Sequence, residues 1–135
     1  MGTIYKLVKF EGSQGEGEFL TLFDSGATMS FIKRSIAQRL GLIDKLPRPI
    51  EFETADKNHK IMATERVSLD FYLDDDRLSD EFLVLPDEIM SEDAIVGAQT
   101  MQKWRLVIDM EKEDVYSTRR IKKHMLKLSF WKLSF

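Results

Sequence analysis

The fold of this chain is decided by the stretch Phe19-Leu20-Thr21-Leu22-Phe23-Asp24-Ser25-Gly26-Ala27-Thr28. Apolar and β-branched residues up to position 23 are typical of a buried β-strand. The run then stops at a carboxylate, and Gly26 permits backbone angles that other residues avoid. The pattern therefore predicts a strand end that holds Asp24 rigidly.

Asp-Ser-Gly is also an ordinary way to end a strand, so the tripeptide alone is weak evidence for a reactive group. The sequence around it adds more. Residues 30–42 have apolar positions at helical spacing, a Ser or Thr cap candidate and a glycine stop, which predicts a short amphipathic helix. Farther along, an apolar run ends at Gly97, followed by an expected helical turn over 98–104 and a buried strand over 106–110.

Taken in this order, the motifs resemble those of the retropepsin-like aspartic proteases. They are Leu22-Phe23-Asp24-Ser25-Gly26-Ala27, the helical segment ending at Gly41, Ile95-Val96-Gly97, and Leu106-Val107-Ile108-Asp109. The resemblance spans about residues 4 to 116. It implies that Asp24 is the catalytic carboxylate and that Ile95, Val96 and Gly97 support the strand end that carries it.

Length and composition agree with one mostly β domain. The chain has 135 residues, of which 43% are hydrophobic and 32% are charged, which suits a single domain with a modest core. The resemblance implies a closed, retropepsin-like β-barrel with one or two short helices and a flap hairpin. We expect the protease domain to cover residues 1–117 and a basic, aromatic tail to cover 118–135.

The resemblance also implies a homodimer. Peptide hydrolysis by carboxylates needs one Asp to activate a water molecule and one protonated Asp to polarise the scissile carbonyl. The sequence has one Asp-Ser-Gly and no Asp-Thr-Gly, so the second carboxylate must come from another chain. A twofold axis between two copies of Asp24 supplies such a pair, with a peptide or protein as substrate.

The residues after Asp24 take supporting roles in this interpretation. The Ser25 hydroxyl can bond to the backbone of the partner chain, and a local turn bond is the alternative. Gly26 leaves room for the two carboxylates to approach each other. Ala27 keeps the substrate side of the turn small.

A long hairpin is predicted by alternating apolar and polar residues over 49–55 and 60–73. By resemblance, the flap that closes over substrate lies at about residues 52–62. Its expected substrate-binding residues are Thr54, Ala55, Asp56, Lys57 and Asn58. Flaps of this family commonly carry glycine near the tip, whereas this chain has none between Gly41 and Gly97, which puts its closure and substrate preference in question.

Other site classes are disfavoured. The chain has two histidines and no cysteine, so we expect no metal site, no cysteine nucleophile and no cofactor. Ser25 lacks the Gly-x-Ser-x-Gly elbow of a serine nucleophile. The glycines at 12, 15 and 17 alternate with acids and precede no helix, which indicates a hairpin loop and not a phosphate site.

Charge is nearly balanced at a formal net of -3, so binding to nucleic acid is not expected. Acidic residues gather in the middle of the chain and basic residues in the tail. The default interpretation is that both form solvated faces. The alternative is that the acidic region of one chain attracts the basic tail of the other within a dimer.

Residues 74–76 are expected to form a turn before a strand over 81–85, which Pro86 ends. The tail fits either helical or strand spacing. The resemblance implies that it can add to a dimer interface; binding to a partner is the alternative, and membrane contact is disfavoured.

No secretory signal or bilayer-spanning run is visible, and the lack of cysteine favours a cytoplasmic location. The sequence thus predicts an aspartic endopeptidase in which two copies of Asp24 activate water across a homodimer. One alternative is a catalytically silent retropepsin-like module that binds peptide or dimerises. Another is an adaptor that acts through its aromatic tail.

Overall fold

The computed structural model describes residues 2–53 and 59–118. Its main sheet is built from β1 (Thr3–Gly12), β2 (Gly15–Asp24), β3 (Phe31–Lys33), β4 (Ile43–Glu53), β5 (Lys60–Leu73), β6 (Asp76–Leu85) and β7 (Ala94–Val96). The remaining elements are α1 (Arg34–Leu40), the 3-10 turn η1 (Asp87–Ile89), α2 (Ala98–Lys103), β8 (Leu106–Asp109) and β9 (Asp114–Ser117). Residues 54–58 of the predicted flap and residues 119–135 of the predicted tail lie outside the described residues.

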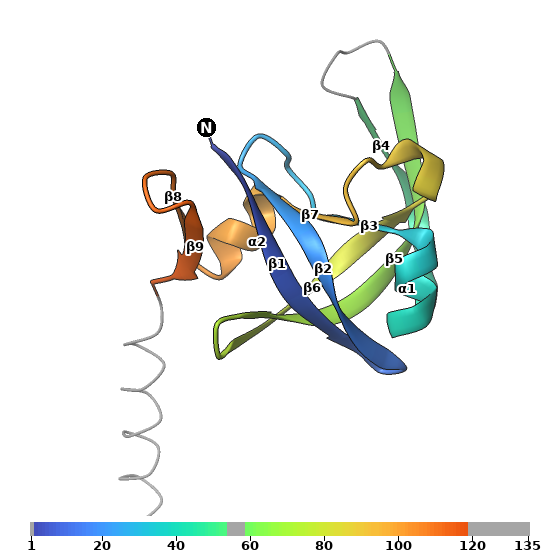
Figure 1. The fold of residues 1–135 in the computed structure, drawn as a ribbon. Coiled ribbons are helices and arrows are strands. Elements are labelled where there is room, and N and C mark those ends of the chain that lie inside the picture. The colour runs from blue at the N-terminus through green and yellow to red at the C-terminus, as the bar shows by residue number, and fades with distance from the viewer. Residues whose placement is uncertain (1, 54–58, 119–135) are drawn as a thin grey trace, which may run out of the picture.

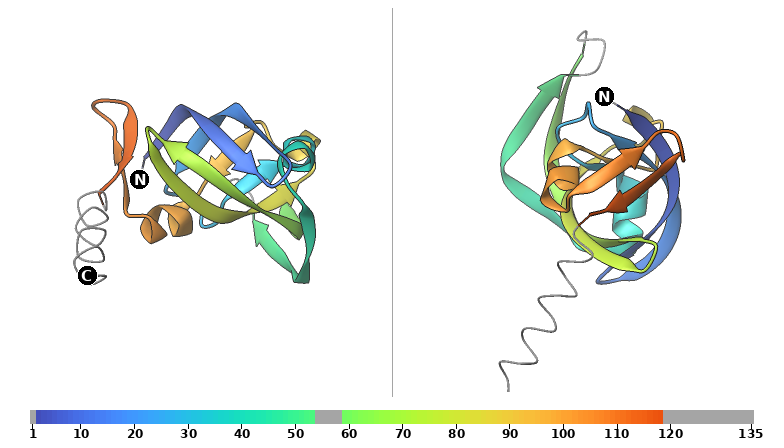
Figure 2. Two further views of the ribbon diagram at one scale, coloured as in Figure 1. Left: turned by 90° about the horizontal axis from the view of Figure 1, so that it is seen from below. Right: turned by 90° about the vertical axis from the view of Figure 1, so that its left-hand side faces the viewer.

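The sheet closes into a barrel, as the sequence predicted. Its strand order is β1-β2-β7-β3-β6-β5-β4, and an added pairing of β1 with β5 joins the two sides. Figure 1 shows α2 and the β8–β9 hairpin at one side of the barrel and α1 at the other, and the left view of Figure 2 agrees. Among the described residues, no helix has the length and apolar character that crossing a bilayer requires.

The core lies where the barrel closes. Phe10 of β1 pairs with Phe71 of β5, and their rings lie 5.9 Å apart. Phe82 of β6 meets both rings edge-on, at 5.5 Å from Phe10 and 5.9 Å from Phe71. All three side chains are fully buried, so the short β1–β5 pairing is stabilised by aromatic packing inside the barrel.

The segment predicted as a helix over 30–42 divides into a strand and a shorter helix. Residues 31–33 form β3, which inserts between β6 and β7, and the helix begins only at Arg34. Phe31 pairs with Leu83 on one side and Ile95 on the other, so tertiary pairing overrides the helical spacing. The predicted Ser or Thr cap is wrong, because Lys33 occupies the cap position without a side-chain hydrogen bond.

The predicted long hairpin forms from β4 and β5, which pair up to Glu53 and Lys60. Strand β4 begins at Ile43, earlier than expected, and its register shifts between Lys45 and Ile50. Pro47 and Pro49 fall in that interval, where proline removes the ladder donors. The hairpin projects beyond the barrel in Figure 1.

The acidic run was correctly read as a turn, although the strand after it is longer than predicted. Leu73 pairs with Asp76, so β6 begins well before the expected start at Glu81. Asp74 has a φ of 57°, the left-handed conformation that Asp tolerates in tight turns. Pro86 follows the last residue of β6, as predicted.

The junction of β7 with α2 crosses closely over the loop that follows β2. The Ala98 amide donates to the Ala27 carbonyl at 2.6 Å, and the Gln99 amide donates to the Thr28 carbonyl at 3.0 Å. A Cβ on Gly97 would lie 2.2 Å from the carbonyl oxygen of Met29, far inside contact distance. Glycine is required here because the two backbones touch; its φ of -97° is ordinary.

The β8–β9 hairpin is joined to the barrel by an ion pair between Lys6 and Asp114. The pKa of the Asp114 carboxyl group lies below its ordinary value, mainly because the group accepts a hydrogen bond from the Lys6 ammonium. A second hydrogen bond, from the Val115 amide, lowers it further.

Val115 is fully buried, whereas Val107 of β8 is 37% exposed. Leu106 and Ile108 of β8 are only half-buried against the core, and β8 ends at Asp109, so the expectation of a buried strand over 106–110 is wrong.

Replacing Gly97 by alanine should destabilise the fold by about 1–3 kcal/mol, because the added methyl group overlaps backbone oxygens that cannot move independently. Urea unfolding measures this loss. Gly41→Ala is the matched control, since its Cβ would meet a Val67 methyl group at 3.1 Å and otherwise make ordinary contacts at 3.7 Å. Equal unfolding midpoints for the two variants would contradict a structural role for the close approach.

Because the folded-state pKa of Asp114 is lowered, its ion pair stabilises the fold above about pH 4 and loses this effect as pH falls through the folded-state pKa. Asp114→Asn should cost less than about 1 kcal/mol at neutral pH, since the pair is partly exposed. The variant should also lose less stability than the parent chain on acidification. Asp74→Asn is the control, because the Asp74 carboxylate lies 4.0 Å from the Lys6 ammonium. Parallel curves of stability against pH for the parent chain and Asp114→Asn would contradict a stabilising role of the ion pair.

Candidate active site

Asp24 is the last residue of β2 and pairs with Thr3 of β1. The Gly26 amide donates to Asp24 Oδ1 at 2.9 Å, and the Ala27 amide donates to the Asp24 carbonyl at 3.1 Å. The side chain stays partly exposed. The turn therefore fixes the direction of the carboxylate while leaving it open to solvent and to a bound molecule.

The end of β2 pairs with β7, which carries two of the residues predicted to support Asp24. The two strands run parallel, with Phe23 opposite Val96 and Leu22 opposite Ile95. Phe23 and Val96 are fully buried, and Ile95 is half-buried. Gly97 then brings α2 against the loop after Asp24, so the structure does bring the predicted support residues together beside the carboxylate.

Sequence reasoning missed a buried pair of hydroxyl groups that ties this loop to α2. Ser30 Oγ lies 2.6 Å from Thr100 Oγ1 and accepts a hydrogen bond from the Gly97 amide at 3.0 Å. Ser30 is 4% exposed and Thr100 is 2% exposed. Their only signal in the sequence was a polar residue within each of two apolar segments, and Ser30 was within the segment read as a capped helix.

Within its own chain, Ser25 bonds to Gly2 and not within the turn, and the bond to a partner chain stays a prediction. Its Oγ accepts from the Gly2 amide at 3.0 Å and donates to the Gly2 carbonyl at 3.2 Å. The Ser25 amide also donates to the Gly2 carbonyl at 3.3 Å. In the single chain, therefore, the residue after Asp24 is bound to the backbone just before β1.

A groove of about 510 Å³ opens beside Asp24. One wall is the loop after β2 together with Phe31, and the other is β4 near the base of the flap hairpin. Its lining residues are Asp24, Gly26, Ala27, Thr28, Met29, Phe31, Ile50, Glu51, Phe52 and Glu53. The rings of Phe31 and Phe52 lie 4.8 Å apart, so the groove combines an apolar surface with the carboxylate of Asp24.

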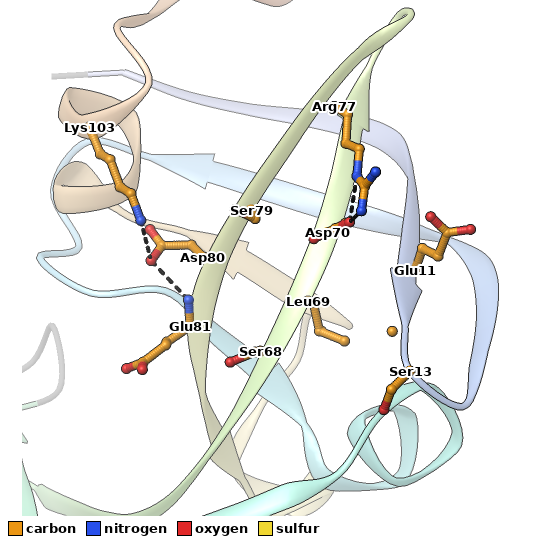
Figure 3. A pocket seen from close by; sticks show the side chains of 11 residues that line it. Glu11, Ser13, Ser68, Leu69, Asp70, Arg77, Ser79, Asp80, Glu81 and Lys103 are labelled. Carbon is orange, nitrogen blue, oxygen red and sulfur yellow. Dashed lines mark hydrogen bonds and ion pairs between the residues drawn. The ribbon is translucent and has the colours of Figure 1, made fainter.

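A larger hollow of about 610 Å³ lies elsewhere on the barrel, across β1, β5, β6 and α2. Figure 3 shows Arg77 directed at Asp70 and Lys103 directed at Asp80, with distances of 2.5 and 3.5 Å. These ion pairs engage four of its charged side chains, while Glu11 accepts from the Tyr72 hydroxyl and Glu81 pairs with Arg66. The hollow contains no part of the Asp24 turn, so we do not assign the chemistry to it.

In the described part of the chain, no group of three or more His, Cys, Asp or Glu side chains is placed to hold a metal ion. The chemistry that the site offers is that of a carboxylate. An ionised carboxylate can take a proton from water, and a protonated one can donate a hydrogen bond to a carbonyl oxygen.

Comparison with known proteins agrees with this geometry. A family model described as aspartyl protease matches residues 8–100. Among solved structures, the retroviral protease-like domain of Ddi1 from Leishmania major is similar, with a TM-score of 0.64, 20% identity, and coverage of 87% of this chain and 90% of that one.

Another similar structure is a Legionella pneumophila protein of unknown function, with a TM-score of 0.45, 12% identity, and coverage of 78% of this chain and 91% of that one. No curated protein sequence gives a significant match. The family model covers more than half of the chain and includes the Asp24 turn, Ile95, Val96 and Gly97. This chain therefore belongs to the aspartyl protease family and has the retropepsin-like fold.

Proposed function

We propose that this chain is an aspartic endopeptidase that acts as a homodimer, with one Asp24 from each copy. The observation that carries the proposal is the rigidly held, partly exposed Asp24 at the edge of an apolar groove. Each chain offers a single Asp-Ser-Gly turn, so a pair of carboxylates requires two chains. Two like charges at close range share one proton, which provides a base and an acid at the same pH.

In this reaction, the ionised Asp24 takes a proton from water as the water oxygen bonds to the scissile carbonyl carbon. The protonated Asp24 of the other copy hydrogen-bonds to the carbonyl oxygen and transfers its proton to it. The C–N bond of the tetrahedral intermediate then breaks as the first Asp24 passes the proton taken from water to the leaving nitrogen. A hydroxyl group of the intermediate returns a proton to the second Asp24 as the new carboxyl group forms. Water is consumed, a carboxyl group and an amine are released, and no bond to the enzyme forms.

Substrate in this proposal is an extended peptide. The groove between the Asp24 loop and β4 gives it an apolar surface, and the edge of β4 offers backbone groups for pairing. Residues 54–58, between the paired ends of β4 and β5, are the proposed closing segment. Ser30 and Thr100 act as positioning residues, because they hold the loop that sets the direction of Asp24.

Asp24→Asn should abolish peptide cleavage, by at least about 10²- to 10⁴-fold, while the fold remains intact. Asparagine keeps an oxygen that can accept from the Gly26 amide but cannot act as a base. Cleavage of a diverse peptide library across pH 4 to 7 measures the loss. Asp70→Asn is the control, because Asp70 pairs with Arg77 and lies opposite Glu11, at the end of β1 away from Asp24.

The same assay at several protein concentrations tests the dimer. Below the dimer dissociation constant, activity should rise more steeply than concentration, because active sites form only on association. Activity strictly proportional to concentration, with a monomer seen by sedimentation, would contradict the shared site. Absence of cleavage from a confirmed dimer would favour the catalytically silent, peptide-binding module instead.

A further inference from the structure

A second apolar hollow, of about 530 Å³, lies against α2 and β8 and is separate from the groove toward β4. Its apolar lining comes from Ala98, Met101, Leu106, Ile108 and Met110. Ser25 also lines it. Anything seated in this hollow therefore touches the residue next to Asp24.

The hollow is only partly covered by the barrel. Met101 is 6% exposed, and Leu106 and Ile108 are half-buried against the core. Met110, which follows β8, is 57% exposed. Covering these side chains would remove further apolar surface from water, which is favourable by about 25 cal/mol per Å².

The described part of the chain ends at the mouth of the hollow. The Thr118 amide and the Thr118 hydroxyl each donate to the Arg105 carbonyl at 3.0 Å. Ser117 Oγ donates to the Trp104 carbonyl at 2.8 Å. Because Arg105 lines the hollow, the segment that follows Thr118 starts beside it.

The composition of residues 119–135, the tail, suits this hollow. Eight of its 17 residues are apolar, six are Lys or Arg, and none is Asp or Glu. Residues 1–118 accordingly carry a formal net charge of -9. At about 3.3 Å per extended residue, the tail is several times longer than the four-residue strand β8.

The rim of the hollow complements the charge of the tail. Glu111 follows Met110, and Glu113 lies two residues farther along the same turn. Both are exposed, and neither forms an ion pair within residues 2–53 and 59–118. Lys112 is the single cation between them, so the turn offers carboxylates to a basic segment that lies in the hollow.

We propose that the tail docks in this hollow of its own chain, with apolar side chains toward β8 and α2 and basic side chains beside Glu111 and Glu113. The same chain is favoured as the source because a short connection keeps the tail at a local concentration on the order of millimolar. The docked tail contacts Ser25 and so links the tail to the turn that carries Asp24. This inference does not require Asp24 to be catalytic.

The absence of cysteine from the sequence allows a direct test in the full chain. Gln102→Cys places one thiol at the exposed edge of the hollow, and Ser129→Cys places the other in the tail. A short thiol-specific cross-linker should join this pair within one chain about tenfold faster than it joins Ser13→Cys with Ser129→Cys. Ser13 is the matched control, because it is exposed in the turn at the other end of β1 from Gly2.

Equal rates for the two pairs would overturn the inference. Faster cross-linking at Ser13 would also overturn it, because Ser13 lines the larger, charged hollow. A product of twice the chain's mass alone would place the tail of a second copy in the hollow and would overturn docking within one chain. The urea unfolding midpoint of each variant guards against a folding defect.

Glu111→Lys tests the charge contribution in the same assay. It should slow the cross-linking of Gln102→Cys with Ser129→Cys by about two- to fivefold at low salt, and the difference should shrink in 1 M salt. Glu88→Lys is the matched control, because Glu88 is also an exposed glutamate without an ion pair among the described residues. An equal slowing in both variants would contradict a specific contact between the tail and this turn.

Discussion

The candidate site depends on the close contact between Gly97 and the loop that follows Asp24. Without a side chain at Gly97, the first turn of α2 approaches closely enough for the Ala98 and Gln99 amides to reach that loop's carbonyls. Two segments more than sixty residues apart thereby become one rigid unit. The buried hydroxyl pair of Ser30 and Thr100 closes the same junction from inside. Rigidity at this point fixes the position of a carboxylate at a strand end.

The two faces of β2, the strand that carries Asp24, lie in different surroundings. Its inward residues complete the barrel core against β7. Leu20 and Leu22, which the sequence placed in a buried strand, lie on the opposite face, and Leu20 is 51% exposed. A continuous apolar run cannot distinguish the two faces of a strand, which explains that error. The groove toward β4 lies beside Asp24, and its apolar surface suits a substrate that is a polypeptide in extended form.

Much of the fold was predictable because the decisive motifs are local. An apolar run ending at Asp-Ser-Gly, a second run ending at Gly97 and a long alternating hairpin each have a direct physical signal. The strand at Phe31 was not predictable in this way, because it exists only through pairing with two distant strands. The bonds of Ser25 to Gly2 and of Ser30 to Thr100 likewise depend on tertiary proximity, for which spacing in the sequence carries no signal.

We propose that one active site needs Asp24 from two chains. Mixing parent and Asp24→Asn subunits tests this most directly. A fixed amount of the parent chain is incubated with increasing Asp24→Asn chain until subunits exchange, and peptide cleavage is then measured. If the site is shared, mixed dimers are inactive and cleavage falls as the variant is added, whereas a variant with a further substitution that prevents dimerisation has no effect. Cleavage that is independent of added Asp24→Asn, in a mixture shown to contain mixed dimers, would contradict the account.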